Sequence, residues 1–133
     1  CFVIEERKNG NMVGYAGLRW EKSNGEKTGV MECEYYIFKP HRGKGYATES
    51  MKALCQRAFA GKLFEKKETG YKYLCRKKIA KPQVIRAMIR SDNIASCCLV
   101  ENCGFRHMGV LQRYFWVENQ YAVDCEIYEL CKE

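Results

Sequence analysis

Apolar and polar residues alternate along the first third of the chain, which predicts three antiparallel strands. The first is expected at Phe2–Arg7, and Asn9-Gly10-Asn11 then supplies the turn residues that tolerate a positive φ. Its partner strand is expected at Met12–Trp20. A polar loop over residues 21–29 separates this strand from a third one at Val30–Phe38. Three consecutive strands of this kind form a β-meander.

A change of period after the third strand predicts an amphipathic helix over residues 44–60. Its apolar residues fall at i, i+4, i+7, i+8, i+11 and i+12, namely Ala47, Met51, Leu54, Cys55, Ala58 and Phe59. This spacing makes one apolar stripe that packs against a sheet. The following segment, 62–81, is rich in Lys and Glu, then aromatic, then basic. It is open to three interpretations: a continued helix, a second short helix or a surface insertion.

The second half of the chain predicts one more strand and helix and a closing hairpin. Pro82 stops any helix before it, and the apolar, β-branched run Gln83–Arg90 is expected to pair in parallel with strand 30–38. Asp92-Asn93 opens a helix that Gly104 ends. Residues 107–117 and 121–130 form the hairpin. The order β-β-β-α-β-α-β-β predicts an α/β (α+β) domain with a mixed, mostly antiparallel sheet.

Length and composition favour one folded domain spanning residues 1–133. The chain is 47% apolar, and none of its apolar runs approaches the ~20 residues that cross a bilayer. No signal peptide opens the sequence. Because Cys1 stands directly before a strand-like run, we expect that the natural start is missing.

Nine cysteines are many for this length, but their pattern does not suggest a disulfide framework or a metal site. Their number is odd, no C-x-x-C occurs, and they lie within apolar periodic segments. We expect buried, reduced thiols and therefore a cytoplasmic protein. A zinc site built from Cys98, Cys103 and His107 would need a fourth ligand and a known spacing, and neither is visible. No metal is predicted.

A short basic glycine loop lies between the third strand and the helix. Gly43 and Gly45 let the backbone approach a ligand, Arg42 and Lys44 add positive charge, and no acidic residue lies between Arg42 and Glu49. A helix N-terminus with free N–H groups binds anions. The loop therefore predicts a phosphate-binding site.

Two familiar phosphate motifs do not fit this loop. A Walker A motif requires Ser or Thr after its lysine, whereas Gly45 follows Lys44. A dinucleotide fingerprint requires a third glycine where Thr48 stands. The formal charge of +7 gathers at residues 39–44 and 62–81. That distribution suits a phosphate-bearing cofactor better than a nucleic acid.

The loop resembles the pyrophosphate motif [QR]-x-x-G-x-[GA] of the GCN5-related N-acetyltransferases, in the form Arg42-Gly43-Lys44-Gly45-Tyr46-Ala47. A second match lies downstream. Asn93-Ile94-Ala95-Ser96 and Glu101-Asn102-Cys103-Gly104-Phe105 resemble N-x-x-S and E-K-x-G-F of the RimJ/RimL-like branch, which acetylates ribosomal-protein alanines. The tail agrees with that branch through Gly109-Val110-Leu111, Asp124 and Tyr128. The resemblance covers about residues 12 to 130.

The resemblance implies the fold of that superfamily, in which two central parallel strands splay apart and helices flank the sheet. The family's first strand and first two helices have no counterpart before Cys1. The resemblance also implies acetyl-CoA as cofactor. Pantetheine would pair with backbone groups at the end of the third strand, the diphosphate would lie on the N–H groups of 43–48, and Asn93 would bind the cofactor arm. The implied cofactor-binding residues are Ile37, Phe38, Lys39, Arg42, Gly43, Lys44, Gly45, Tyr46, Ala47, Thr48, Asn93 and Ser96.

The implied reaction is direct attack of a neutral amine on the thioester within a ternary complex. It needs a base, donors for the oxyanion and a proton for the leaving thiolate. A strand amide near Ile37 is the expected oxyanion donor. Glu32 and Glu34 share one strand face with Tyr36 and Phe38 by alternation. They are candidates for binding a cationic acceptor and for base catalysis through a water, with Glu34 favoured. Alternatively, both are solvated edge charges.

Many relatives protonate the thiolate with a tyrosine of the last helix, and here Val100 takes that position. In the branch resembled, the serine of N-x-x-S has this part, and Ser96 matches it. The alternative is a helix-start serine that bonds only to backbone. Tyr114, Tyr121 and Tyr128 are the substitutes.

Three functions follow in order of preference. The first is an N-acetyltransferase that moves an acetyl group from acetyl-CoA to a primary amine, either a protein N-terminus or a small molecule. The second is a catalytically silent acyl-CoA-binding module, and the third is a basic nucleic-acid-binding domain. A monomer or homodimer without membrane attachment is expected.

Overall fold

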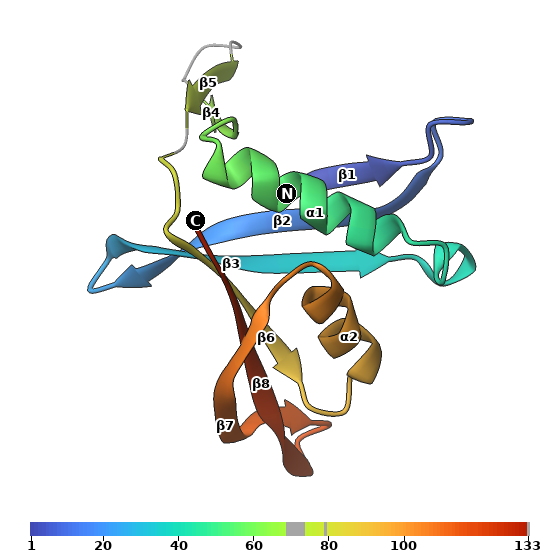
Figure 1. Ribbon diagram of the computed structural model, residues 1–133, viewed down its shortest axis with the longest axis vertical. Helices are drawn as coiled ribbons and strands as arrows, with labels where there is room; N and C mark the ends of the chain where they lie inside the picture. Colours follow the sequence, from blue (N-terminus) through green and yellow to red (C-terminus); the bar gives the residue numbers. More distant parts are fainter. Residues whose placement is uncertain (69–73, 79, 133) are drawn as a thin grey trace.

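The computed structural model describes residues 1–68, 74–78 and 80–132. Its core is a six-stranded mixed sheet with strand order β1-β2-β3-β6-β8-β7. Figure 1 shows this sheet with both helices packed along it. The order and the mixed pairing confirm the expected class. Among the described residues, no helix has the length and apolarity needed to cross a membrane.

The β-meander consists of β1 (Phe2–Glu5), β2 (Met12–Ser23) and β3 (Glu26–Ile37). The prediction of a loop over residues 21–29 is wrong, because β2 and β3 extend through this range to a two-residue turn at Asn24-Gly25. These two residues have φ values of 51° and 79°. Two consecutive positive φ values match the twist of the flanking strands, so the hydrogen-bonded ladder continues up to the turn.

The parallel strand β6 (Val84–Arg90) pairs with β3 over only three positions, Val30↔Val84, Met31↔Ile85 and Glu32↔Arg86. Beyond these positions β3 continues to Ile37 and β6 to Arg90 without pairing with each other. The expected splay between the two central strands is therefore present. It leaves backbone groups of both strands available at the edge of an opening.

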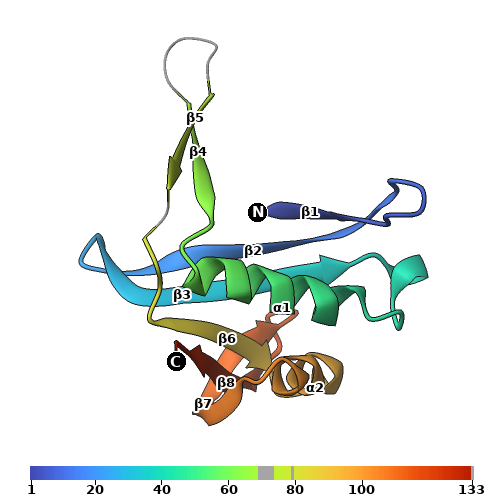
Figure 2. The same ribbon diagram turned by 45° about the horizontal axis from the view of Figure 1, so that its top comes forward.

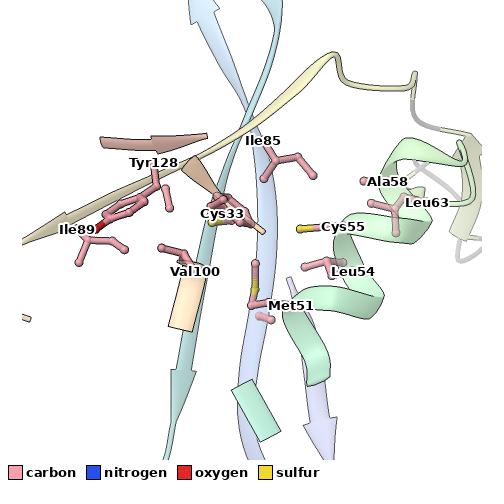
Figure 3. Close-up of a cluster of buried hydrophobic side chains, with 13 residues drawn as sticks. Cys33, Met51, Leu54, Cys55, Ala58, Leu63, Ile85, Ile89, Val100 and Tyr128 are labelled. Atoms are coloured by element: carbon pink, nitrogen blue, oxygen red, sulfur yellow. The ribbon is translucent and has the colours of Figure 1, made fainter. Parts of the chain in front are cut away.

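The two helices cover the same face of the sheet. Helix α1 (Tyr46–Phe59) contacts β2 and β3, α2 (Ile94–Asn102) contacts β6, and the helices contact each other. Figure 2 shows α1 in front of β3 and α2 next to the end of β6. Figure 3 shows that Met51, Leu54 and Cys55 face the side chains of Ile85 and Val100. This apolar cluster sets the position of the α1 N-terminus, and the observed helix agrees with the expected 44–60.

The described residues of segment 62–81 include β4 (Phe64–Glu68) and β5 (Leu74–Lys78), which pair with each other in a separate two-stranded sheet. Of the three interpretations of this segment, a continued helix and a second helix are therefore wrong, and a surface insertion is confirmed. Helix α1 stops because Gly61 follows its C-cap with a φ of 67°. The two ends of the insertion meet, since a Cβ on Gly61 would lie 3.1 Å from Lys81 Cγ. Figures 1 and 2 show the hairpin projecting away from the domain.

The C-terminal part follows the expected pattern. Asn93 is the N-cap of α2, where its Oδ1 accepts a hydrogen bond from Ser96 N at 3.2 Å, and Gly104 adopts a φ of 90° just after the helix. Strands β7 (Arg106–Val117) and β8 (Tyr121–Cys131) form the closing hairpin. Residues 125–131 of β8 pair with the whole of β6.

The cysteines divide by burial, so the expectation of uniformly buried thiols is wrong. Cys33, Cys55 and Cys125 are buried, whereas Cys1, Cys98 and Cys131 are exposed. The exposed ones lie at the start of the chain, within α2 and at the end of β8. Apolar periodicity places a residue in an element, but which face of the element is covered depends on tertiary packing.

Two buried thiols make stability sensitive to alkaline pH. Burial raises the pKa of Cys33 and of Cys55 from 9.0 to about 12 in each case. Above pH 9 the unfolded chain loses these protons while the folded chain keeps them, so the stabilisation present below pH 9 is lost as pH rises toward 12. We expect the free energy of unfolding to fall by about 1.4 kcal/mol per pH unit for each thiol. Urea denaturation at several pH values measures this slope.

The control for this prediction is Cys55→Ala, which removes one of the two groups. The variant should show a shallower decrease between pH 9 and 11 than the wild type. Equal slopes in both proteins would contradict the proposed effect of burial on the thiol pKa.

Candidate functional site

A cavity of about 500 Å³ opens where β3 and β6 separate, between the N-terminal ends of α1 and α2. Residues from the end of β3, the glycine loop and both helices contribute to its walls. The lining residues are Tyr35, Tyr36, Ile37, His41, Arg42, Gly43, Gly45, Tyr46, Ala47, Thr48, Asn93, Ala95, Ser96, Cys98, Leu99 and Asn102. The cavity is therefore where the two sequence motifs meet.

The glycine loop shapes one wall of this cavity. Gly43 and Gly45 have φ values of 77° and 83°, a region that residues with a Cβ enter at a cost. Gly45 is the N-cap of α1, and within the described part of the chain no side chain caps this helix end. The first-turn N–H groups of Tyr46, Ala47 and Thr48 and the positive end of the helix dipole can therefore bind an anion.

Arg42 connects the loop to the end of β3. Its Nε donates a hydrogen bond to Ile37 O at 2.8 Å, and its guanidinium lies 5.2 Å from the centre of the Tyr36 ring. Both contacts hold a positive charge at the mouth of the cavity. Ile37 is one of the residues expected to pair with pantetheine, and its carbonyl oxygen keeps a second lone pair that can accept a hydrogen bond from a ligand.

The backbone just after β3 is already hydrogen-bonded. Phe38 N donates to Val13 O at 2.9 Å, and a 3₁₀ turn, η1 (Lys39–His41), uses the carbonyls of Phe38 and Lys39. Neither residue lines the cavity, and Lys44 does not line it either. The other nine predicted cofactor residues do line it. The roles assigned to all twelve remain predictions.

Sequence reasoning missed several lining residues. Ala95, Cys98 and Asn102 follow one another at i, i+3 and i+7 on one side of α2, so helical spacing counted from Ala95, the neighbour of Ser96, could have identified them. Tyr35 is different, because its neighbour Tyr36 lines the cavity too, although alternating strand residues point to opposite faces. The edge position of the cavity at the end of β3 explains why both residues reach it.

Glu32 and Glu34 lie on the face of β3 opposite the helices and do not line the cavity. Glu32 forms an ion pair with Arg19 at 3.3 Å. Glu34 is exposed, and its carboxylate lies over Gly17, where an added Cβ would be 3.2 Å from Oε1. Beside them is a row of aromatic rings. The Tyr15 ring stacks on the Tyr36 ring with their centres 5.8 Å apart, and the Phe38 ring is edge-on to Tyr36 with a distance of 5.9 Å between centres. This face combines negative charge with aromatic surface.

The tyrosines considered as substitutes lie elsewhere. Tyr114 and Tyr121 are exposed on the β7–β8 hairpin, and Tyr128 is buried with its hydroxyl donating to Glu101 Oε1 at 2.8 Å. These three residues do not belong to the described lining of the cavity. Val100 is fully buried in the core.

The splayed parallel strands, the uncapped helix after a Gly-x-Gly loop and the cavity between them define an acyl-CoA-binding type of α/β domain. The sequence profile described as an acetyltransferase (GNAT) domain matches residues 1–106. The chain belongs to this family. A search of curated protein sequences gives no match.

Solved structures with the same fold include acetyltransferases from three bacteria. An N-acetyltransferase from Staphylococcus aureus Mu50 is 26% identical, with a TM-score of 0.74 over 98% of this chain and 66% of that one. A GNAT-family acetyltransferase from Bacillus anthracis is 18% identical, with a TM-score of 0.73 over 98% and 64%. The structure of yncA from Salmonella typhimurium, with its cofactor acetyl-CoA, is 21% identical, with a TM-score of 0.72 over 94% and 61%.

These comparisons confirm the predicted superfamily and fold. They also agree with acetyl-CoA as the cofactor, since acetyl-CoA is the acyl donor of this family and is present in one neighbour. The chain spans less than two thirds of the length of each of these three structures.

Proposed function

We propose that this chain binds acetyl-CoA in the cavity between β3 and α2 and transfers its acetyl group to a primary amine by direct attack in a ternary complex. The observation that carries the proposal is the cavity itself. It lies at the splay of two parallel strands, and an uncapped helix N-terminus forms one wall. This combination offers an anion site and an edge of unpaired strand at the same place.

The cofactor's chemical parts match the walls of the cavity. Its diphosphate fits the N–H groups of 43–48, where the helix dipole and Arg42 supply positive charge. The pantetheine arm would extend along the end of β3 toward Asn93. Bound in this way, acetyl-CoA supplies the activated thioester, while the chain binds, orients and handles protons.

The amine acceptor is proposed to approach from the opposite face of β3. There Glu32 and Glu34 attract a cation, and the rings of Tyr15 and Tyr36 offer a surface that binds organic ammonium groups. Glu34 is the proposed base, acting through a water. A protein N-terminus or a small amine fits this face, and the N-x-x-S motif at Asn93–Ser96 favours the RimJ/RimL-like branch.

A catalytically silent acyl-CoA-binding module is the second candidate. It is favoured by one observation, the exposure of Glu34 outside the cavity. For either function we propose a monomer or homodimer. We also propose a cytoplasmic location, because exposed thiols such as Cys98 and Cys131 persist in a reducing compartment.

Glu34→Gln separates the enzyme from the silent module. If Glu34 is the base, thiol release from acetyl-CoA with an amine panel should fall about 100-fold in kcat, because general base catalysis contributes about this much. Acetyl-CoA should still raise the melting temperature of the variant, since a ligand of the folded state stabilises it. Glu26→Gln, at the start of β3, is the matched control and should retain wild-type turnover.

Two results would count against the assignments. Turnover that is unchanged in Glu34→Gln would remove Glu34 from the mechanism. Thermal protection by acetyl-CoA without thiol release from any amine would favour the silent module.

A further inference from the structure

We propose that the hydroxyl of Tyr35, assisted by Ser96, donates the proton that the leaving sulfur of coenzyme A receives. This proposal rests on the proposed acetyl-CoA-dependent function and assigns to it a residue outside both sequence motifs. It fills the role that Val100 cannot perform here.

Tyr35 reaches the cavity from the helix side of the sheet. On β3 it alternates with Glu34 and Tyr36 and shares its face with the buried Cys33 and Ile37. Its cross-strand partner on β2 is Ala16, a small residue. The ring thus lies under the splayed end of β3 and lines the cavity together with Ser96 of α2.

The Tyr35 hydroxyl is buried and has no hydrogen-bond partner among the described residues. Buried tyrosine hydroxyls are nearly always paired, so an unpaired one beside a cavity indicates a partner that arrives with a ligand. Ser96 is the polar side chain placed to bond with it, although the two hydroxyls are outside bonding geometry in this structure. The other titratable groups facing Tyr35 are the thiols of Cys33, Cys97 and Cys103.

Other tyrosines near the cavity are less suited to this role. Tyr36 lies on the opposite face of β3, where its ring stacks on Tyr15 and is partly exposed. Tyr46 is the first residue of α1, at the anion-binding end of the cavity. Tyr35 is the lining tyrosine that lies next to the Ser96 hydroxyl.

The environment keeps Tyr35 in the proton-donating form. Burial raises the pKa of Tyr35 above its ordinary 10.0, and Ser96 opposes this only in part. The phenol is therefore protonated at neutral pH. Ser96, by donating to the phenolate oxygen, favours the transient ion that remains when the proton moves.

The proposed step balances in atoms, electrons and protons. The amine nitrogen forms a bond to the acetyl carbon, and the carbon–sulfur bond breaks with its electron pair going to sulfur. The sulfur takes the proton of Tyr35, while the nitrogen loses one proton to the base on the other face of β3. The base then releases its proton to water and Tyr35 regains a proton from water, so the proton that nitrogen loses balances the one that sulfur gains.

The test compares coenzyme A with an analogue in which hydrogen replaces the thiol, and it needs no knowledge of the acceptor. Calorimetry at pH 7 and pH 9.5 gives both affinities. Because the hydrogen bond to an ionised sulfur is the stronger one, we expect the preference of the wild type for coenzyme A to rise about tenfold with pH. Tyr35→Phe should lose that rise and keep its affinity for the analogue. Tyr114→Phe, on the exposed β7 surface, should behave as wild type.

A kinetic readout complements binding once an amine acceptor has been found. Tyr35→Phe should lower kcat about 100-fold with little change in KM for acetyl-CoA, and adding Ser96→Ala should cost far less than it does in the wild type. The melting temperature of Tyr35→Phe, which lacks only an unpaired hydroxyl, shows whether the variant folds.

The possible failures are distinguishable. If the folded wild type binds neither coenzyme A nor the analogue, the proposed function fails, and this inference fails with it. If both ligands bind and Tyr35→Phe shows the same pH-dependent preference as the wild type, the inference alone is overturned.

Discussion

Thr48→Asp is expected to weaken coenzyme A binding about 100-fold while leaving the protein at least as stable as the wild type. Thr48 lies in the first turn of α1 and lines the cavity. A carboxylate there would face the diphosphate at close range. At an effective dielectric constant near 20, one such repulsion at about 4 Å costs about 4 kcal/mol, and partial solvent exposure reduces this to about 3 kcal/mol.

The same substitution favours the fold, and this makes the prediction specific. A negative charge in the first turn of a helix stabilises it by about 0.3–1 kcal/mol, and Gly45 provides no side-chain cap here. Binding and stability should therefore change in opposite directions. Calorimetric titration with coenzyme A measures the first change, and thermal unfolding of the free protein measures the second.

Thr48→Asn is the matched control, because it has nearly the same shape as Asp without the charge. It should retain affinity within a few-fold of the wild type. Equal affinity of the Asp and Asn variants would show that the diphosphate does not lie at the α1 N-terminus.

Ile85→Ala is expected to destabilise the domain by about 2–5 kcal/mol, the usual cost of emptying a core site of this size. Ile85 is fully buried on β6, between Met31 of β3 and Leu130 of β8. Since domains are stable by about 5–15 kcal/mol, this loss is a large share of the total. The melting temperature should fall by roughly 10 °C or more.

Two further variants give this prediction a scale. Ile85→Val removes one methylene and should cost about 0.5–1.5 kcal/mol. Ile94→Ala, at the exposed start of α2, should stay within about 0.5 kcal/mol of the wild type. Equal destabilisation by Ile85→Ala and Ile94→Ala, measured by urea denaturation, would contradict the central place of β6 in the core.

Much of the fold was predictable because its signals are local. The alternation in β2 and β3, the apolar stripe from Met51 to Ala58 and the cap at Asn93 each depend on neighbours within one element. The glycine loop was recognisable for the same reason. Gly43 and Gly45 take positive φ values, which glycine adopts without strain.

The predictions that failed depended on longer-range pairing. Segment 62–81 has no clear period, so its self-paired hairpin could not be told from a helix. The loop expected over 21–29 gave way to a longer ladder, because each cross-strand hydrogen bond between β2 and β3 extends the pairing to the Asn24-Gly25 turn.

By itself, the sequence determined the order of the elements outside residues 62–81, the anion-binding loop and the superfamily, since these depend on local spacing and short motifs. Only the tertiary structure decided which side chains meet. It put Tyr35 beside Ser96 at the cavity and left Glu34 on the other face of β3. The reason is physical: these relations depend on where β3 and β6 stop pairing and how α2 packs across them, and residues far apart in the chain set both.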